Sequence, residues 1–371
     1  MMSKLDNASN SRKIICFLIL LLWGFSAYSN DSDSFFSREA ELRFQLEIPV
    51  SELKNQRGDD PEWLDGALTY IDAEGKDQRL EVTVKARGNF RRKRSSCSFP
   101  SYWVNLKKKQ VKGTVLGGLD KLKIVSHCRE TRKSFEPYIY KEYLAYKSFN
   151  ILTEKSFKAR ITKISYIESK NGKSVGEFAG FVLEPVEDLA DRLGGQVVSE
   201  RYVLPSLYDP ATLCRAELFQ FMVGNTDFSF VASQDECCHN GKAVALPDGY
   251  AAIPYDFDMS GIVDTPYAVP NPGLKLRSVR DRKYRGIQVS KEVFDGVVRE
   301  FISAKQDIIS IWDETDMLPE KEKEEALAYI KEFYRILENP ILLKTQIRSK
   351  MRNGSKMEEY IEERINELAT P

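Results

Sequence analysis

Short runs of alternating apolar and polar residues dominate the chain between positions 40 and 125. Gly, Asp and Asn separate these runs, and such residues favour turns. In the run 80–86, the residues that alternate with polar neighbours, as in a half-buried strand, are Leu80, Val82, Val84 and Ala86. Two more strands are expected at 159–168 and 176–185, around the turn Asn171-Gly172. The pattern predicts a sheet-rich amino-terminal part.

Helical spacing of apolar residues appears first at 138–152 and then dominates the second half of the chain. A short helix is expected at 188–193, and a longer one begins at Pro210 with Asp209 as its N-cap and runs to Val223. A hairpin is expected at 242–254, and nearly everything after 291 predicts helix. We therefore expect an α+β fold, with a β-rich part at 30–185 and a mainly helical part at 186–371.

The amino terminus carries an apolar stretch of 14 residues, 14–27, after Arg12 and Lys13. The stretch is shorter than the roughly 20 residues of a spanning helix, and small residues at Ala27 and Ser29 suit cleavage. We interpret residues 1–29 as a signal peptide, which predicts an exported protein, periplasmic or secreted. An uncleaved amino-terminal anchor is the alternative.

Composition excludes several classes of protein. The chain has 371 residues, 42% of them hydrophobic, and 55 basic residues balance 55 acidic ones. This balance does not fit wholesale disorder, and a single long apolar run excludes a multi-span membrane protein. With only His127 and His239 present, a zinc site built from three histidines is excluded.

Five cysteines remain after the apolar stretch, and in an oxidising compartment they can form disulfides. We expect Cys97 to pair with Cys128, because each follows a strand-like segment of one basic region. A second pair would join Cys214 to Cys237 or Cys238. A zinc site at Cys237-Cys238-His239 is the alternative, although a second ligand pair at the usual spacing is absent.

The stretch 219–261 holds the most informative polar residues. A predicted helix ends at Gly224, Asp227 and Asn240 lie in the following loop, and the hairpin then leads directly to Asp256 and Asp258. Metal-dependent phosphoryl transfer needs one carboxylate to orient the attacking hydroxyl, and an amide oxygen with a second carboxylate to hold Mg²⁺. The alternative is structural: the Asp side chains cap a helix and a turn.

The region from Lys85 to Lys133 is strongly basic, with fifteen Lys or Arg against Asp120 and Glu130, a local net charge of +13. Such a cluster attracts phosphate or another polyanion, including an anionic envelope component such as lipid or lipopolysaccharide. Nucleic acid is not expected as the partner of an exported chain. A solvated basic sheet face is the alternative.

Within the basic region, Arg87 ends a strand at a Gly turn where backbone can approach a ligand. Alternation places Lys121 and Lys123 on one strand face, so that either could hold a phosphate. Glu142, on the next helix, is the expected carboxylate partner, as in the Lys–Glu pair of kinases. In the alternative interpretation these are ordinary surface residues.

With these segments in view, the chain resembles the spore-coat CotH kinase family, an atypical protein-kinase-like fold with HipA-type kinases as more distant relatives. The resemblance covers about 85–261 and rests on the segments VKARGNFRRKRSSCSFPSYWVNL, KLKIVSHC, YKEYLAYKSFNIL, GFVLEP, LFQFMVGNTD, HN and IPYDFDMSG. It implies a two-lobed fold with a sheet-rich N-lobe, a mainly helical C-lobe and a ligand site between them. It also implies Mg²⁺ and ATP as cofactors.

The resemblance also implies a role for each candidate residue. Those on the catalytic and metal side are Asp227 as the catalytic-loop Asp, Asn240 and Asp256 as metal ligands, and Asp258 as a possible second one. On the nucleotide side, Lys123, or less favourably Lys121, would bind the phosphates, with Glu142 on the following helix as the carboxylate partner of the lysine. Arg87 would lie near the phosphates, and Glu184 would lie at the hinge between the lobes. The expected activity is phosphoryl transfer from a nucleotide to a hydroxyl acceptor. The alternative functions are a non-catalytic, pseudokinase-like module that binds a polyanion or envelope partner, and a structural envelope protein.

Overall fold

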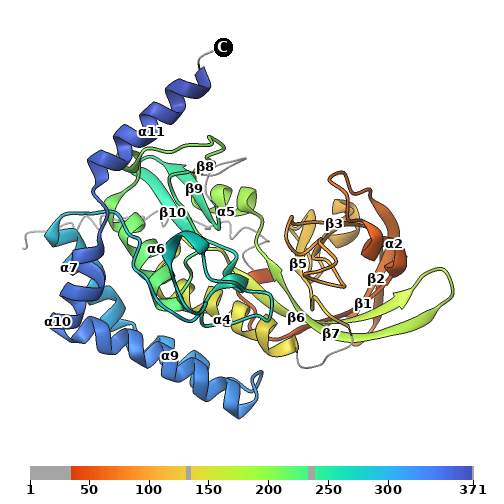
Figure 1. Ribbon diagram of the computed structural model, residues 1–371. Coiled ribbons are helices and arrows are strands. Elements are labelled where there is room, and N and C mark those ends of the chain that lie inside the picture. The colour runs from red at the N-terminus through yellow and green to blue at the C-terminus, as the bar shows by residue number, and fades with distance from the viewer. Residues whose placement is uncertain (1–34, 131–134, 233–238, 370–371) are drawn as a thin grey trace, which may run out of the picture.

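The computed structural model describes residues 35–130, 135–232 and 239–369, and Figure 1 shows two parts that differ in secondary structure. The first part is a strongly curved sheet, and the second consists mainly of helices around a small sheet. Buried apolar side chains form two clusters, one inside the curved sheet and a larger one that extends through the helices. The expected α+β class is confirmed.

Seven strands form a mixed sheet that closes into a barrel: β1 (Leu42–Ile48), β2 (Leu64–Ile71), β3 (Asp77–Ala86), β4 (Tyr102–Leu106), β5 (Lys121–Val125), β6 (Ala159–Glu168) and β7 (Lys173–Leu183). Their order is β1-β2-β3-β4-β5-β7-β6. The barrel closes because β1 pairs in parallel with β6, whereas the other neighbouring strands are antiparallel. Two short helices, α2 (Val50–Asn55) and α3 (Lys108–Val111), lie in the connections.

The alternation predicted for β3 is confirmed in the barrel wall. Its apolar residues point inward and are buried, namely Leu80, Val82, Val84 and Ala86, whereas Glu81 is exposed and Lys85 is half-buried. The barrel interior therefore uses one face of each strand, and the other face is left for polar side chains. On β3, β4 and β5 this outer face carries the residues that matter for the candidate site.

Helix α4 (Glu136–Leu152) joins the two parts, because it contacts β6 and β7 of the barrel as well as α8 of the helical part. The other α-helices are α5 (Val186–Arg192), α6 (Pro210–Val223), α7 (Lys291–Ser303), α8 (Lys305–Asp313), α9 (Glu320–Glu338), α10 (Pro340–Leu342) and α11 (Gly354–Ala369). In Figure 1, α11 projects away from the rest of the chain.

Helix α6 begins and ends as its sequence predicts, and it leads directly into the candidate site. The Asp209 side chain accepts a hydrogen bond from the Thr212 backbone N–H at 2.8 Å, which caps the helix. Gly224 ends it with a left-handed φ of +69°. The expected hairpin follows as β9 (Gly241–Leu246) and β10 (Gly249–Pro254), to which β8 (Gln196–Val197) adds a third strand.

The predicted disulfide between Cys97 and Cys128 is confirmed. The second pairing is not seen: Cys214 is a buried free thiol, and Cys237 and Cys238 lie outside the described residues. The proposed signal peptide, 1–29, also lies outside them. Within the described ranges, no helix has the length and apolar character needed to cross a membrane.

Candidate functional site

The β9–β10 hairpin places Asn240 and Asp256 at the same end. Gly241 pairs with Pro254 in the ladder, and one step beyond, the Tyr255 N–H donates to the Asn240 carbonyl at 3.3 Å. Asn240 and Asp256 both adopt left-handed backbone conformations, with φ of +47° and +61°. Such conformations are uncommon outside glycine, although Asn and Asp adopt them more readily than other residues, and they cluster at functional sites.

Asp227, in the loop after α6, is in direct contact with Asn240. The Asn240 amide nitrogen donates to the Asp227 carbonyl oxygen at 2.5 Å and to its carboxylate Oδ2 at 3.0 Å. Because the amide nitrogen faces Asp227, the amide oxygen points the other way and can act as a ligand. The structure thus joins the expected catalytic Asp to the expected metal-binding Asn, although thirteen positions separate them.

His239 also contacts Asp227, a pairing that the sequence analysis did not predict. Its Nε2 lies 3.1 Å from Asp227 Oδ1. The hydrogen bond from His239 lowers the pKa of Asp227, and the same contact raises the pKa of His239. Asp227 is therefore kept ionised and fixed in orientation by two neighbours, while about a third of its side chain remains exposed.

Asp256 lies among positive charges. Burial raises its pKa to about 6 and nearby Asp258 adds to this rise, whereas Arg91, Arg87 and Lys123 oppose it. Its backbone N–H donates to the Tyr146 hydroxyl at 2.9 Å, which fixes the segment after β10 against α4. No hydrogen bond to its carboxylate is present among the described residues.

Lys123 is buried on the outer face of β5 between three aromatic rings. Its Nζ lies 4.8 Å from the centre of the Tyr255 ring, 5.5 Å from that of Phe157 and 5.9 Å from that of Trp103. Burial, with Arg87 nearby, lowers the pKa of Lys123 to about 7. Lys121 contacts the same Trp103 ring at 5.2 Å, which confirms the predicted shared face.

Arg87 directly follows β3, and cross-strand pairing sets Lys85, Trp103 and Lys123 side by side. The Arg87 guanidinium carbon lies 5.7 Å from the centre of the Trp103 ring. Across the described ranges, no ion pair involves Lys85, Arg87, Lys121 or Lys123. Such a group of unpaired cations attracts anions.

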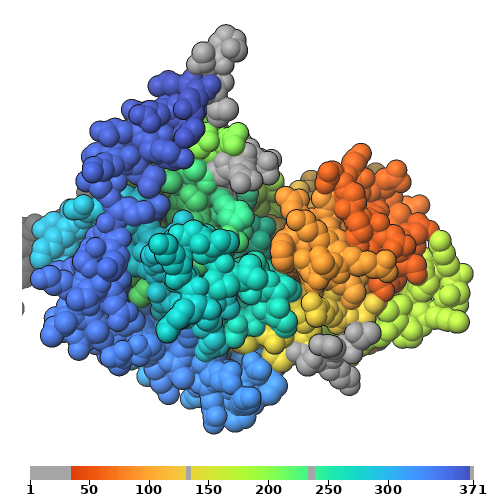
Figure 2. Space-filling view, in the orientation of Figure 1, coloured from red at the N-terminus to blue at the C-terminus, as the bar shows by residue number. Residues whose placement is uncertain are grey.

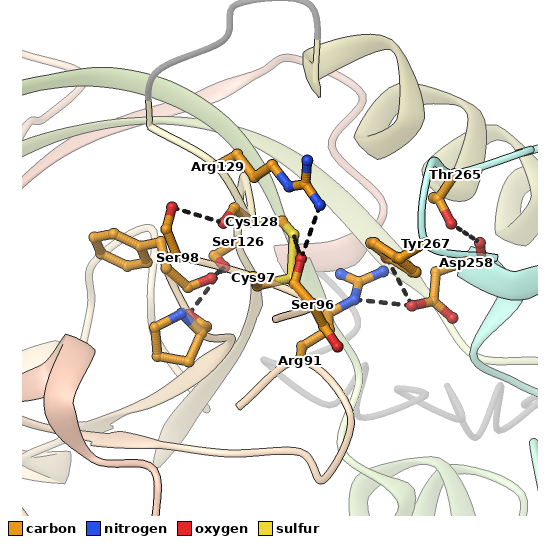
Figure 3. Close-up of a disulfide and its surroundings, with 12 residues drawn as sticks. Arg91, Ser96, Cys97, Ser98, Ser126, Cys128, Arg129, Asp258, Thr265 and Tyr267 are labelled. Carbon is orange, nitrogen blue, oxygen red and sulfur yellow. Dashed lines mark hydrogen bonds and ion pairs between the residues drawn. A yellow bond between two sulfur atoms is a disulfide. The ribbon is translucent and has the colours of Figure 1, made fainter. Parts of the chain in front are cut away.

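The expected Lys–Glu pair is replaced by a different arrangement. Glu142 is bonded to the guanidinium of Arg91 and not to Lys123 or Lys121. Arg91 Nε also donates to Asp258 Oδ2 at 3.0 Å, and the Tyr267 hydroxyl donates to the same oxygen at 2.8 Å. Figure 3 shows Arg91 extended toward Asp258 and Tyr267. Asp258, expected as a possible second metal ligand, thus has one carboxylate oxygen already engaged.

Glu184 follows β7 at the entrance to α5, where a hinge between lobes was expected. Its carboxylate forms a two-point ion pair with Arg192 at 2.8 and 2.9 Å and also accepts the Lys158 backbone N–H at 3.0 Å. The buried Glu184 carboxylate thus joins the end of β7 to α5 and to the segment before β6, and removing one partner of such a buried pair would be costly.

The basic region divides into buried and exposed residues. Arg91 and Arg92 are buried, whereas exposed positive side chains are found at Lys93, Arg94, Lys107, Lys108, Lys109 and Lys112. The last two cations of the region, Arg132 and Lys133, lie outside the described residues. Figure 2 shows a notch between the barrel surface and the surface of the helical part.

Sequence reasoning missed the contacts that Arg91, Tyr267 and His239 make. Arg91 stands in a run of four basic residues, 91–94, and nothing local marks it as the one that turns inward. His239 could have been noted as the neighbour of Asn240, but its contact with Asp227 depends on the loop between them. Comparison with protein-family models and with curated proteins finds no match to this chain.

Proposed function

We propose that this chain is an exported, atypical kinase-like protein that transfers a phosphoryl group from a nucleotide to a hydroxyl acceptor. The observation that carries the proposal is the contact between Asn240 and Asp227, at the hairpin end that also holds Asp256. The order of sheet, helix, loop and hairpin supports a two-lobed kinase-like fold. The disulfide is compatible with export, because disulfides persist in oxidising compartments.

The donor set fits a magnesium ion held with few protein ligands. No group of three His, Cys, Asp or Glu that could hold a metal occurs in the described part of the chain. Magnesium, however, is often bound through one or two protein oxygens together with phosphates and water. Asn240 and Asp256 would hold the ion, which when bound would neutralise phosphate charge.

The remaining roles follow from charge and position. Asp227 is ionised and partly exposed, so it can accept a hydrogen bond from an acceptor hydroxyl and orient it. Lys123 and Arg87 form no ion pair with any residue that the structure describes and lie near Asp256, so they would bind the phosphates. Positive groups placed in advance around a transferring phosphoryl group lower its barrier.

The test is nucleotide turnover by the mature protein, comparing wild type with Asp227→Asn and Asp256→Asn. Each substitution should reduce turnover by roughly 10²–10⁴-fold. Asp264→Asn is the matched control, because Asp264 also has a left-handed backbone and its carboxylate contacts Arg280. Equal turnover in all four proteins would eliminate the assigned roles.

A second candidate is a non-catalytic module that binds a polyanion, favoured by the cations around Trp103, which form no ion pair with the residues described by the structure. Thermal-shift measurements separate the two, since a ligand that binds only the folded state raises the melting temperature. The module would be favoured if inorganic tripolyphosphate or a longer polyanion raises the melting temperature and Mg²⁺-ATP raises it no further than tripolyphosphate does.

A further inference from the structure

Arg91 connects three segments that are far apart in sequence. It lies in the loop between β3 and β4, Glu142 lies on α4, and Asp258 follows β10. The side chains of Arg91, Glu142 and Asp258 are only 8%, 2% and 5% exposed. This buried contact therefore joins the barrel to both elements that flank the candidate site.

The geometry uses the planar fork of arginine. Nε contacts Asp258 while Nη2 contacts Glu142, so one guanidinium bridges two carboxylates at once. Burial opposes the charge, but Glu142, Tyr267 and Asp258 outweigh it and hold the pKa of Arg91 well above its ordinary value. A lysine at position 91 has a single charged nitrogen and cannot reproduce this bridge.

Neighbouring contacts hold the Arg91 loop and its partners in place. The Cys97–Cys128 disulfide ties the loop to the segment after β5, and the Arg129 guanidinium donates to the Ser96 carbonyl nearby (Figure 3). On the other side, the Phe90 ring packs 5.4 Å from the ring of Tyr267, which itself donates to Asp258. The loop that carries Arg91 is thereby held on one side by the disulfide and on the other by the contact of Phe90 with Tyr267.

The bridge has a consequence for Lys123. Because Arg91 neutralises Glu142, the lysine has no carboxylate partner on α4 and remains between aromatic rings close to Asp256. In a Lys–Glu pair, one lysine both orders the helix and meets the phosphate. Here these two tasks fall to different residues.

We propose that Arg91 is a positioning residue: it holds α4 and the segment carrying Asp256 and Asp258 in register, and it leaves Lys123 free to bind an anion. This inference rests on the proposed phosphoryl-transfer function. Because the Arg91 guanidinium is buried and bonded to Glu142 and Asp258, we expect its loss to affect the metal-dependent part of binding and turnover more than the phosphate contacts of Lys123.

The test measures two ligands with Arg91→Met, Arg91→Lys and Arg92→Met. Arg92 is the matched control, since it is equally buried in the same loop but donates to the carbonyls of Gly88 and Gly58. Arg91→Met should weaken Mg²⁺-ATP binding and lower kcat by roughly 10–100-fold. Its affinity for metal-free tripolyphosphate should change by less than about threefold, since among the described residues no contact joins Arg91 to Lys123 or Arg87, and sites that share no partner are close to additive.

The control variants decide whether the effect is specific. Arg91→Lys should recover only part of the loss, and Arg92→Met should keep wild-type Mg²⁺-ATP binding even where its melting temperature falls. If Arg91→Met and Arg92→Met behave alike, or if tripolyphosphate binding falls in parallel with Mg²⁺-ATP binding, the positioning role is overturned while turnover by wild type stands. Absence of turnover and of Mg²⁺-ATP binding in wild type would instead overturn the proposed function, and this inference with it.

Discussion

Lys123 should destabilise the folded protein, and replacing it with methionine should therefore increase stability. The side chain is 7% exposed, and among the described residues it forms no ion pair. Desolvation is the main reason that its pKa falls from 10.5 to about 7, with Arg87 and Lys242 adding to the decrease. Methionine has a similar length and keeps the contacts with the surrounding rings without a charge.

The size and sign of the effect follow from linkage. A pKa decrease from 10.5 to about 7 corresponds to roughly 5 kcal/mol of unfavourable free energy for the charged form, and contacts with the rings remain with methionine. Below pH 7 the lysine is protonated in both states and this cost is present in full. Between pH 7 and 10.5 the unfolded chain binds more protons, so wild-type stability rises with pH. We expect Lys123→Met to gain about 2–5 kcal/mol at pH 6.

Urea denaturation of both proteins at pH 6, 8 and 10 measures this gain directly. The difference should shrink as pH rises and be small near pH 10, and Lys121→Met, at a half-exposed position, should show little change at any pH. The variant should also lose binding of tripolyphosphate, since a buried residue kept at a cost to stability is expected to serve function. A variant that is less stable than wild type at pH 6 would refute the reasoning, because Lys123 would then have a stabilising partner.

Three further predictions concern the scaffold. Replacing Cys97 and Cys128 with serine should lower the free energy of unfolding by about 3–4 kcal/mol, because a cross-link over 31 residues is lost. Urea denaturation measures this change, and unchanged stability would contradict the prediction. Gly224→Ala should lower stability by about 2–4 kcal/mol, because φ is +69° and the new Cβ would lie 1.9 Å from the Tyr329 hydroxyl; a wild-type melting curve would contradict this. Burial raises the pKa of Glu217 to about 8, so the stability that its protonation contributes should be lost between pH 4.5 and 8, and Glu217→Gln should make the fall in stability over this range shallower in pH-dependent denaturation. An identical slope in the variant would show that another group is responsible.

Local patterns were enough to predict much of the secondary structure. The alternation in β3, the Asp209 cap of α6 and the Asp-Gly turn of the β9–β10 hairpin act over a few residues, so they are visible without the fold. The predicted hairpin also places Asn240 before its first strand and Asp256 after its second strand. Both residues therefore lie at the open end of the hairpin. The Cys97–Cys128 disulfide was inferred for the related reason that each cysteine follows a strand of one region.

The partner of each charge was decided only by the tertiary structure. The sequence offers Lys121, Lys123 and Arg91 as equally positive groups, and alternation cannot tell which of them reaches Glu142. That choice depends on the path of the loop after β3 and on a disulfide that anchors it, and both act across long sequence separations. The closure of the barrel by β1 and β6 was hidden for the same reason.

The sequence by itself determined the α+β class, most of the strands and helices, and the hairpin that Asn240 and Asp256 flank. The tertiary structure alone decided that Arg91 bonds to Glu142 and Asp258, that His239 contacts Asp227, and that Lys123 forms no ion pair within the described part of the chain. The physical reason is the sequence separation of the interacting residues. Hairpin ladders and side-chain periodicity are set by residues that are close together in the chain. The choice between competing ion pairs in a buried region is instead set by desolvation and geometry, which exist only once distant segments have packed together.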